Sequence, residues 1–224
     1  MSDPEPEAAL DRPASSIEAA ATAGLVFAVL YGAVLLIFIQ APGRTAPADD
    51  IISWYSDPGH RGWMVAAFNL AAFSAVAFLW FVGVIRKRVG AREDQFFATV
   101  FLGSAILFVA LMLVGLGLLV AVALSIGETL VPDAGEIAIV GRAAELILVV
   151  AMPRMQAVFI ATTSTIGLRT GALARWLVIV GYLFAALLTL APIVIEIPGL
   201  GFGLWVALVS ASLLVHRQQL ERLE

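Results

Sequence analysis

The sequence predicts an all-α protein, a polytopic membrane helix bundle with six transmembrane helices and both termini in the cytoplasm. The first observation is composition. The 224 residues are 61% hydrophobic and 13% charged, with a mean hydropathy of +0.99, whereas soluble domains are roughly 45–50% apolar and about 25% charged. The second observation is that the apolar runs are long and continuous. Such runs indicate helices, because a membrane barrel would show short segments of alternating polarity.

The apolar runs divide the chain into six expected spans, since a helix needs about 20 apolar residues to cross the hydrocarbon core. We expect these spans near residues 20–40, 63–85, 96–123, 142–167, 176–196 and 200–216. Together they form a transmembrane domain over residues 18–217. The acidic, proline-containing tail 1–17 lacks the basic start of a secretory signal, so we expect a disordered cytoplasmic tail. Residues 218–224 form a second cytoplasmic tail.

The basic residues predict the orientation, because cytoplasmic loops carry an excess of Lys and Arg. With the N-terminus inside, three basic residues face outward, namely Arg44, Arg61 and Arg142. Nine lie near cytoplasmic span ends: Arg12, Arg86, Lys87, Arg88, Arg92, Arg169, Arg175, Arg217 and Arg222. This asymmetry predicts that residues 41–62 and 124–141 face outward.

The longest outer loop, residues 41–62, predicts a short helix near 50–57 that lies at the membrane interface. Asp49 or Asp50 can cap its start, and Trp54 is of a type that prefers the interface. Asp57 and His60 are both possible metal ligands. A site needs further ligands at settled positions, so we expect no metal here.

The residue inventory argues against catalysis. The chain has no Cys, one Lys and two His, and the catalytic serine, zinc, phosphate-binding and dinucleotide motifs are absent. No Lys lies within an expected span, which excludes a retinal Schiff base, and we expect no cofactor. The formal net charge of −4 argues against a nucleic-acid partner. We therefore expect a protein that is not an enzyme.

Arg154 is the candidate functional residue, because it interrupts the fourth span near its middle. A charge at that depth costs roughly 2.5–3.5 kcal/mol on insertion scales. Pro153 cannot donate a hydrogen bond to the carbonyl of Val149, and Asn69 and Thr189 are expected at a similar depth. One interpretation is a polar cluster of these groups that locks helix packing. The other is a cationic site for an anion, a lipid headgroup or a solute carboxylate.

Helical geometry predicts the neighbours of Arg154. Arg142 and Glu145 are three residues apart and should form an ion pair at the outer interface. At about 100° per residue, Glu145 lies opposite Arg154 and should not neutralise it. The face that carries Arg154 is expected to pack closely against another helix; its other members are Ala151, Val158, Ala161 and Thr165.

Two stretches of the chain are similar to a known group of proteins. The first has an aromatic-Asp/Gly-Arg loop at Tyr55, Gly59 and Arg61, then Phe-Leu-Trp-Phe at 78–81 and a basic turn. The second is a Leu-Arg-Thr-Gly…Arg-Trp turn over 168–176. This pattern resembles a widespread group of uncharacterised actinobacterial integral membrane proteins. The resemblance implies a six-span bundle in the cytoplasmic membrane of a bacterium, and it carries no established activity or functional residues.

Two functions are compatible with this sequence. The first is a non-enzymatic structural or accessory partner in a bacterial envelope complex, in contact with the lipid bilayer, with anionic lipid, and with other membrane proteins or further copies of itself. The alternative is a small transporter or channel with an anion or lipid-headgroup site at Arg154. Its basis is the Pro153–Arg154 break, because irregular helices at membrane depth are typical of transport sites.

Overall fold

The computed structural model describes residues 12–42, 46–89, 95–127, 133–171, 173–190 and 198–221, and regular structure within them is helical, as predicted. The helices are α1 (Arg12–Phe38), α2 (Ala48–Ser56), α3 (Pro58–Val89), α4 (Gln95–Gly127), α5 (Ala134–Glu145), the π-helical turn η2 (Leu146–Ala151), α6 (Met152–Thr170), α7 (Arg175–Leu190) and α8 (Pro198–Glu221). Helices α5, η2 and α6 follow one another without a break.

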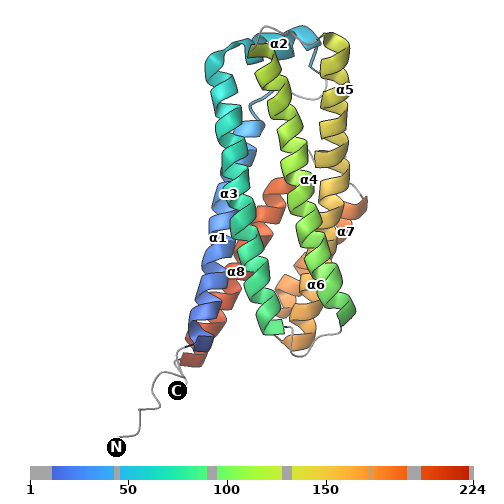
Figure 1. Cartoon of the computed structure of the whole chain (residues 1–224). Helices are drawn as coiled ribbons and strands as arrows, with labels where there is room; N and C mark the ends of the chain where they lie inside the picture. The colour runs from blue at the N-terminus through green and yellow to red at the C-terminus, as the bar shows by residue number, and fades with distance from the viewer. Residues whose placement is uncertain are drawn as a thin grey trace, which may run out of the picture.

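The long helices run side by side (Figure 1). Helix α2 lies across one end of the bundle, and the helices nearest the two termini, α1 and α8, reach the other end. Helix α1 packs against α3 and α8, while α6 packs against α4 and α7. Helices α7 and α8 occupy only the half of the bundle nearer the termini (Figure 1). The end below α2 is therefore built from α1, α3, α4 and α5.

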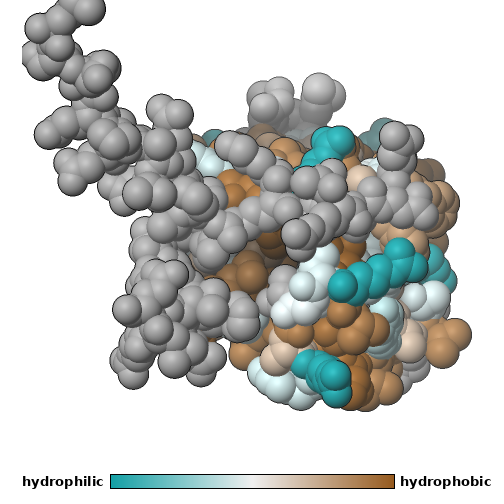
Figure 2. Space-filling view, turned by 90° about the horizontal axis from the view of Figure 1, so that it is seen from below, coloured by the Kyte–Doolittle hydropathy of each residue, from teal (hydrophilic) through white to brown (hydrophobic). Residues whose placement is uncertain are grey.

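Within the described residues, three helical segments are long and apolar enough to cross a membrane, namely Ala19–Phe38, Pro58–Arg86 and Phe96–Ile126. They indicate membrane association, and they coincide with the first three expected spans. Large apolar side chains point outward from the bundle, including Phe73 at 67% exposure and Leu183 at 68%. Seen from the end where the termini lie, hydrophilic side chains are scattered among many hydrophobic ones (Figure 2).

The remaining expected spans take other forms. The fourth, 142–167, is divided among α5, η2 and α6. The fifth and sixth coincide with shorter apolar helices over Arg175–Leu190 and Gly199–Val215, and residues 191–197 lie outside the described residues. Helix α1 starts at Arg12, inside the expected tail 1–17, of which residues 1–11 are also outside the description. Helix α8 continues to Glu221, past the start of the expected tail 218–224.

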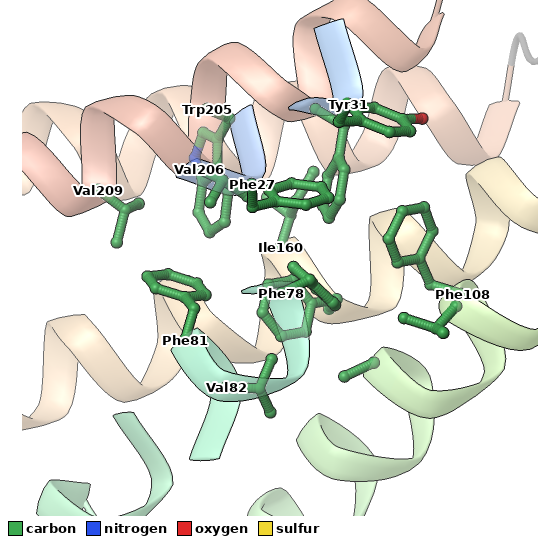
Figure 3. Packing of buried hydrophobic residues seen from close by; sticks show 14 of the residues in the cluster. Phe27, Tyr31, Phe78, Phe81, Val82, Phe108, Ile160, Trp205, Val206 and Val209 are labelled. Carbon is green, nitrogen blue, oxygen red and sulfur yellow. The ribbon is translucent and has the colours of Figure 1, made fainter. Parts of the chain in front are cut away.

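A cluster of aromatic rings forms the core of the bundle (Figure 3). Phe78 of α3 is central to it, with its ring centroid 4.8 Å from that of Phe27 on α1 and 5.1 Å from that of Phe108 on α4. Phe159 of α6 and Phe202 of α8 also contact Phe78, at 5.1 and 5.7 Å. Tilted and edge-to-face pairs at these distances are favourable. The cluster therefore joins α1, α3, α4, α6 and α8.

The short helix predicted near residues 50–57 is confirmed as α2. Its predicted caps are wrong, because Pro47 is the N-cap and Asp49 and Asp50 lie in the first turn, where carboxylates favour the positive end of the helix dipole. Trp54 packs with the small apolar cluster at this end of the bundle, around Tyr55.

Asp57 and His60 both have protein partners at the corner between α2 and α3. The Asp57 carboxylate accepts a hydrogen bond from the amide of Gly59 at 2.7 Å. The His60 ring stacks on Trp54 with centroids 4.1 Å apart, and Arg61 donates to the carbonyl of Tyr55 at 2.6 Å. These contacts satisfy backbone groups that helix ends leave without partners.

Helix η2 lies close to α4 because Gly115 has no side chain. A Cβ atom at Gly115 would lie 2.5 Å from Cγ of Leu148 in η2, which is far below ordinary contact distance. The amide of Met152 donates to the carbonyl of Ile147, five residues earlier, which is the π-helical pattern. The wide turn of η2 is thus pressed directly against the α4 backbone.

We expect Gly115→Ala to destabilise the bundle by about 1–3 kcal/mol, the usual cost of overpacking. The control is Gly103→Ala on the same helix, where an added Cβ meets nothing within 4 Å. It should be neutral or stabilising, because alanine is the better helix former. Melting temperatures in detergent measure both. The double variant Gly115→Ala/Leu148→Ala should recover part of the loss, and a failure to recover any would contradict this contact as the cause.

Candidate functional site

A cavity of about 730 Å³ lies between α1 on one side and α5 with η2 on the other. Residues of α4, including Met112 and Leu116, line it as well, and so does α2 through Ile51 and Tyr55. In the described part of the chain, α1 packs mainly on α3 and α8, whereas α5 packs on α4. The cavity is the space that this arrangement leaves between α1 and α5.

Most of the residues that line the cavity are apolar. Helix α1 contributes Val34, Leu35 and Phe38, and η2 contributes Leu148 and Val149. Tyr55 also lines the cavity, and burial raises the pKa of its hydroxyl to about 12. That hydroxyl is therefore neutral at physiological pH.

Two charged residues, Arg142 and Glu145, are the only ones among the lining residues of the described chain. They lie in the last turn of α5, with Nη1 of Arg142 3.6 Å from Oε2 of Glu145. The Arg142 side chain is 79% exposed and the Glu145 side chain 24%. The expected pair is thus present and forms a polar rim on an apolar cavity. Its placement at the outer interface of a membrane stays a prediction.

Met152 and Tyr31 line the deeper part of the cavity. Tyr31 stacks on Phe27 of the aromatic core at 5.1 Å, and its hydroxyl accepts a hydrogen bond from Nε2 of Gln156 at 3.1 Å. Gln156 is fully buried. Sequence analysis missed it, although an uncharged amide within an apolar run of the fourth span was a visible signal.

The structure does not bring the predicted cluster around Arg154 together by hydrogen bonds. The Arg154 guanidinium donates to the carbonyl of Val150 in its own helix, and not to that of Val149. Asn69 is exposed and donates to Val65 at 2.9 Å. Thr189 is also exposed and donates to Ala185 at 2.8 Å. Each of the three side chains is satisfied within its own helix.

Arg154 is half-buried on α6. The other residues of its predicted packing face are half-buried too: Ala151, Val158, Ala161 and Thr165. The buried face of α6 instead carries Met152, Gln156, Phe159 and Ile160. The π-helical turn η2 lies between Glu145 and Arg154. The constant rotation of about 100° per residue, from which these two side chains were expected on opposite faces, does not hold across that turn.

Pro153 is buried in the first turn of α6, directly after η2. Proline has no N–H to donate. It is therefore compatible with a position directly after Met152, whose amide makes the π-helical hydrogen bond at the end of η2. Among the described residues, no three His, Cys, Asp or Glu side chains lie together as metal ligands would. The polar side chains that line the cavity are those of Arg142, Glu145, Tyr31 and Tyr55, and Gln156 is hydrogen-bonded to Tyr31.

Comparison of the chain with protein-family models, with curated proteins and with solved structures gives no match.

Proposed function

We propose that this protein is a non-enzymatic, six-span protein of a bacterial cytoplasmic membrane that holds one lipid molecule in the cavity between α1 and α5. The cavity is the observation that carries this proposal. Its volume of about 730 Å³ lies within the roughly 300–1,000 Å³ that is usual for small-molecule sites. Its apolar walls suit an acyl chain, and its charged rim suits a headgroup.

The dimensions of the cavity support a lipid as occupant. Met152 lies ten residues after Arg142, which is about 15 Å along a helix. The hydrocarbon core of a bilayer is ~30 Å thick, so this depth matches one leaflet. With the rim at the headgroup level, an acyl chain of the same leaflet would extend toward Tyr31. Large apolar side chains on the neighbouring outer surfaces, such as Ile139 and Leu36, would keep that surface in lipid.

The six-span topology, with both termini cytoplasmic, rests on the helix order and on the basic residues. The ends of α3 and α4 that carry residues 89 and 95 lie at the same end of the bundle as the chain termini (Figure 1). So do the end of α6 and the start of α7. Arg86, Arg169 and Arg175 belong to this end, and the excess of Lys and Arg there favours a cytoplasmic location. A lipid held near α2 would then come from the outer leaflet.

Such a protein could stabilise an envelope complex through a bound lipid, as an accessory partner in contact with other membrane proteins or a further copy of itself. The alternative is a small transporter with its site at Arg154. One observation favours movement of a solute or lipid: the irregular turn η2 forms part of the cavity wall, and π-helical turns are frequent at functional sites.

We expect Gly141→Phe to displace the bound lipid. Gly141 lines the cavity, and an added Cβ there meets nothing within 4 Å. A phenyl ring at this position can therefore occupy the cavity without displacing backbone. Native mass spectrometry of the protein, released from mild detergent, should show one retained phospholipid for the wild type. Occupancy in the variant should fall at least about tenfold, since filling a site with a side chain competes directly with the ligand.

Two control variants separate the possible sites. Gly83→Phe adds the same ring on α3, which does not line the cavity, at a position where an added Cβ meets nothing within 4 Å. It should retain the lipid. Arg154→Leu tests the alternative site and should also retain it, because Arg154 does not line the cavity. Equal retention by Gly141→Phe and wild type would refute the cavity as the lipid site, and loss of lipid only in Arg154→Leu would favour the alternative.

A further inference from the structure

The charged rim contains a carboxylate beside the arginine, and this limits the kind of headgroup that it can accept. Arg142 and Glu145 both line the cavity. An arginine alone would select an anion, because a guanidinium binds phosphate through paired hydrogen bonds. Here a carboxylate oxygen lies 3.6 Å from Nη1 of Arg142. The two charges cancel, and a purely anionic headgroup at the arginine would also approach the carboxylate.

We infer that the lipid in the cavity is a phospholipid with a zwitterionic headgroup that ends in a primary ammonium, with its phosphate at Arg142 and its ammonium at Glu145. This inference rests on the proposed function of the cavity. The headgroup presents one negative and one positive charge, and the rim presents the opposite charge to each. Like charges placed together at a binding surface weaken binding, whereas complementary ones set specificity.

The geometry of the ion pair leaves the Arg142 guanidinium able to bind phosphate. Charge-assisted hydrogen bonds between nitrogen and oxygen are ~2.7–2.9 Å long, and the distance of 3.6 Å from Arg142 to Glu145 exceeds this. The guanidinium has five N–H donors in a plane, so it can contact a phosphate while it remains beside the carboxylate. Its 79% exposure makes those donors accessible from outside the cavity.

The ammonium must be a hydrogen-bond donor to match Glu145. A primary ammonium has three N–H groups, and a carboxylate accepts through both oxygens. A quaternary ammonium carries the same charge but has no N–H group. We therefore expect phosphatidylethanolamine to bind more tightly than phosphatidylcholine, and more tightly than the anionic phosphatidylglycerol. All three have the same acyl chains in the test, so the cavity itself does not distinguish them.

The experiment compares headgroup preference in full-length wild type, Glu145→Gln and Arg142→Gln. Each delipidated protein is mixed with equal amounts of the three phospholipids in micelles, and the bound lipid is measured by native mass spectrometry. Wild type should prefer phosphatidylethanolamine. Glu145→Gln keeps the size of the side chain but removes its charge, so the preference should shift toward phosphatidylglycerol by roughly two- to fivefold, the range that solvent-accessible ion pairs give. Arg142→Gln should weaken binding of all three.

The outcomes distinguish this inference from the proposed function. If wild type binds a lipid that Gly141→Phe loses, but Glu145→Gln has an unchanged preference, the cavity holds a lipid and the zwitterionic assignment is wrong. A wild-type preference for phosphatidylglycerol would overturn the assignment as well. If no variant changes lipid binding, including Gly141→Phe, the proposed function itself fails. Melting temperatures of Glu145→Gln and wild type should agree closely, which shows that a shift in preference does not come from unfolding.

Discussion

Replacing Phe78 by alanine should destabilise the protein more than any other single truncation in its core. We expect a loss of about 3–5 kcal/mol, the range for removal of a buried phenylalanine. The Phe78 side chain is fully buried, and its ring contacts rings from four other helices, α1, α4, α6 and α8. Its removal would leave a void where those helices meet.

In a membrane, Phe78→Ala is still expected to destabilise the protein, but the loss of free energy has a different origin from that in a soluble protein. Helices that separate within a bilayer enter lipid and not water, so the hydrophobic transfer term contributes little. The contacts between closely packed atoms still contribute, because a void has no partner atoms to replace them. Each favourable aromatic pair adds ~0.5–1.5 kcal/mol. We therefore expect the loss for Phe78→Ala near the lower end of the range.

Phe73→Ala is the matched control, because it removes the same group from the same helix at 67% exposure. It should change stability by less than about 0.5 kcal/mol, as surface substitutions usually do. Denaturant titration in micelles, followed by tryptophan fluorescence, measures both variants. If Phe73→Ala costs as much as Phe78→Ala, the ring cluster is not the main contact between these helices.

The parts of the fold that depend on local composition could be predicted from the sequence. Hydrophobic runs and the absence of charge predicted the helices now seen as α1, α3 and α4. The aspartates and Trp54 near residue 50 predicted the short helix α2. Arg142 and Glu145, three residues apart in one helix, form the ion pair that their spacing predicted. Each of these depends on neighbours in the chain.

The candidate site could not be predicted in the same way, because it depends on how helices pack. The cavity exists because α1 and α5 pack on different neighbours, which no local pattern specifies. The orientation of Arg154 relative to Glu145 could not be predicted from a constant rotation, because η2 lies between them. Gly115 permits η2 to approach α4 closely. From the sequence, a glycine in an apolar run predicts only a close helix contact, and not which segment makes it.

The predicted fifth and sixth spans coincide with the shorter apolar helices over Arg175–Leu190 and Gly199–Val215. Helix α7 has 16 residues, or about 24 Å at 1.5 Å per residue, which is less than the ~30 Å hydrocarbon core. Residues 191–196, the last part of the predicted fifth span, lie outside the described residues. Helices α7 and α8 lie in the half of the bundle nearer the termini, and other helices form the half near α2 (Figure 1). The cavity lies in the half near α2, close to α2 itself and to the start of α8.

The topology has an all-or-none test, because the chain has no cysteine and each introduced thiol is the only one. Ser53→Cys lies on α2 and Ala174→Cys lies just before α7, and both positions are exposed. They are at opposite ends of the bundle (Figure 1). An impermeant maleimide applied to intact cells should label nearly all of Ser53→Cys and almost none of Ala174→Cys. After the membrane is permeabilised, both should react.

The reason for this expectation is the distribution of basic residues together with the path of α5, η2 and α6. Ala174 is flanked by Arg169 and Arg175, and such residues are held on the cytoplasmic side. To place it there, the chain between α4 and Ala174 must cross the membrane once, through the segment that contains η2. Labelling of both cysteines in intact cells would show that this segment does not cross. Labelling of Ala174→Cys alone would reverse the orientation and move the cavity rim to the cytoplasmic leaflet.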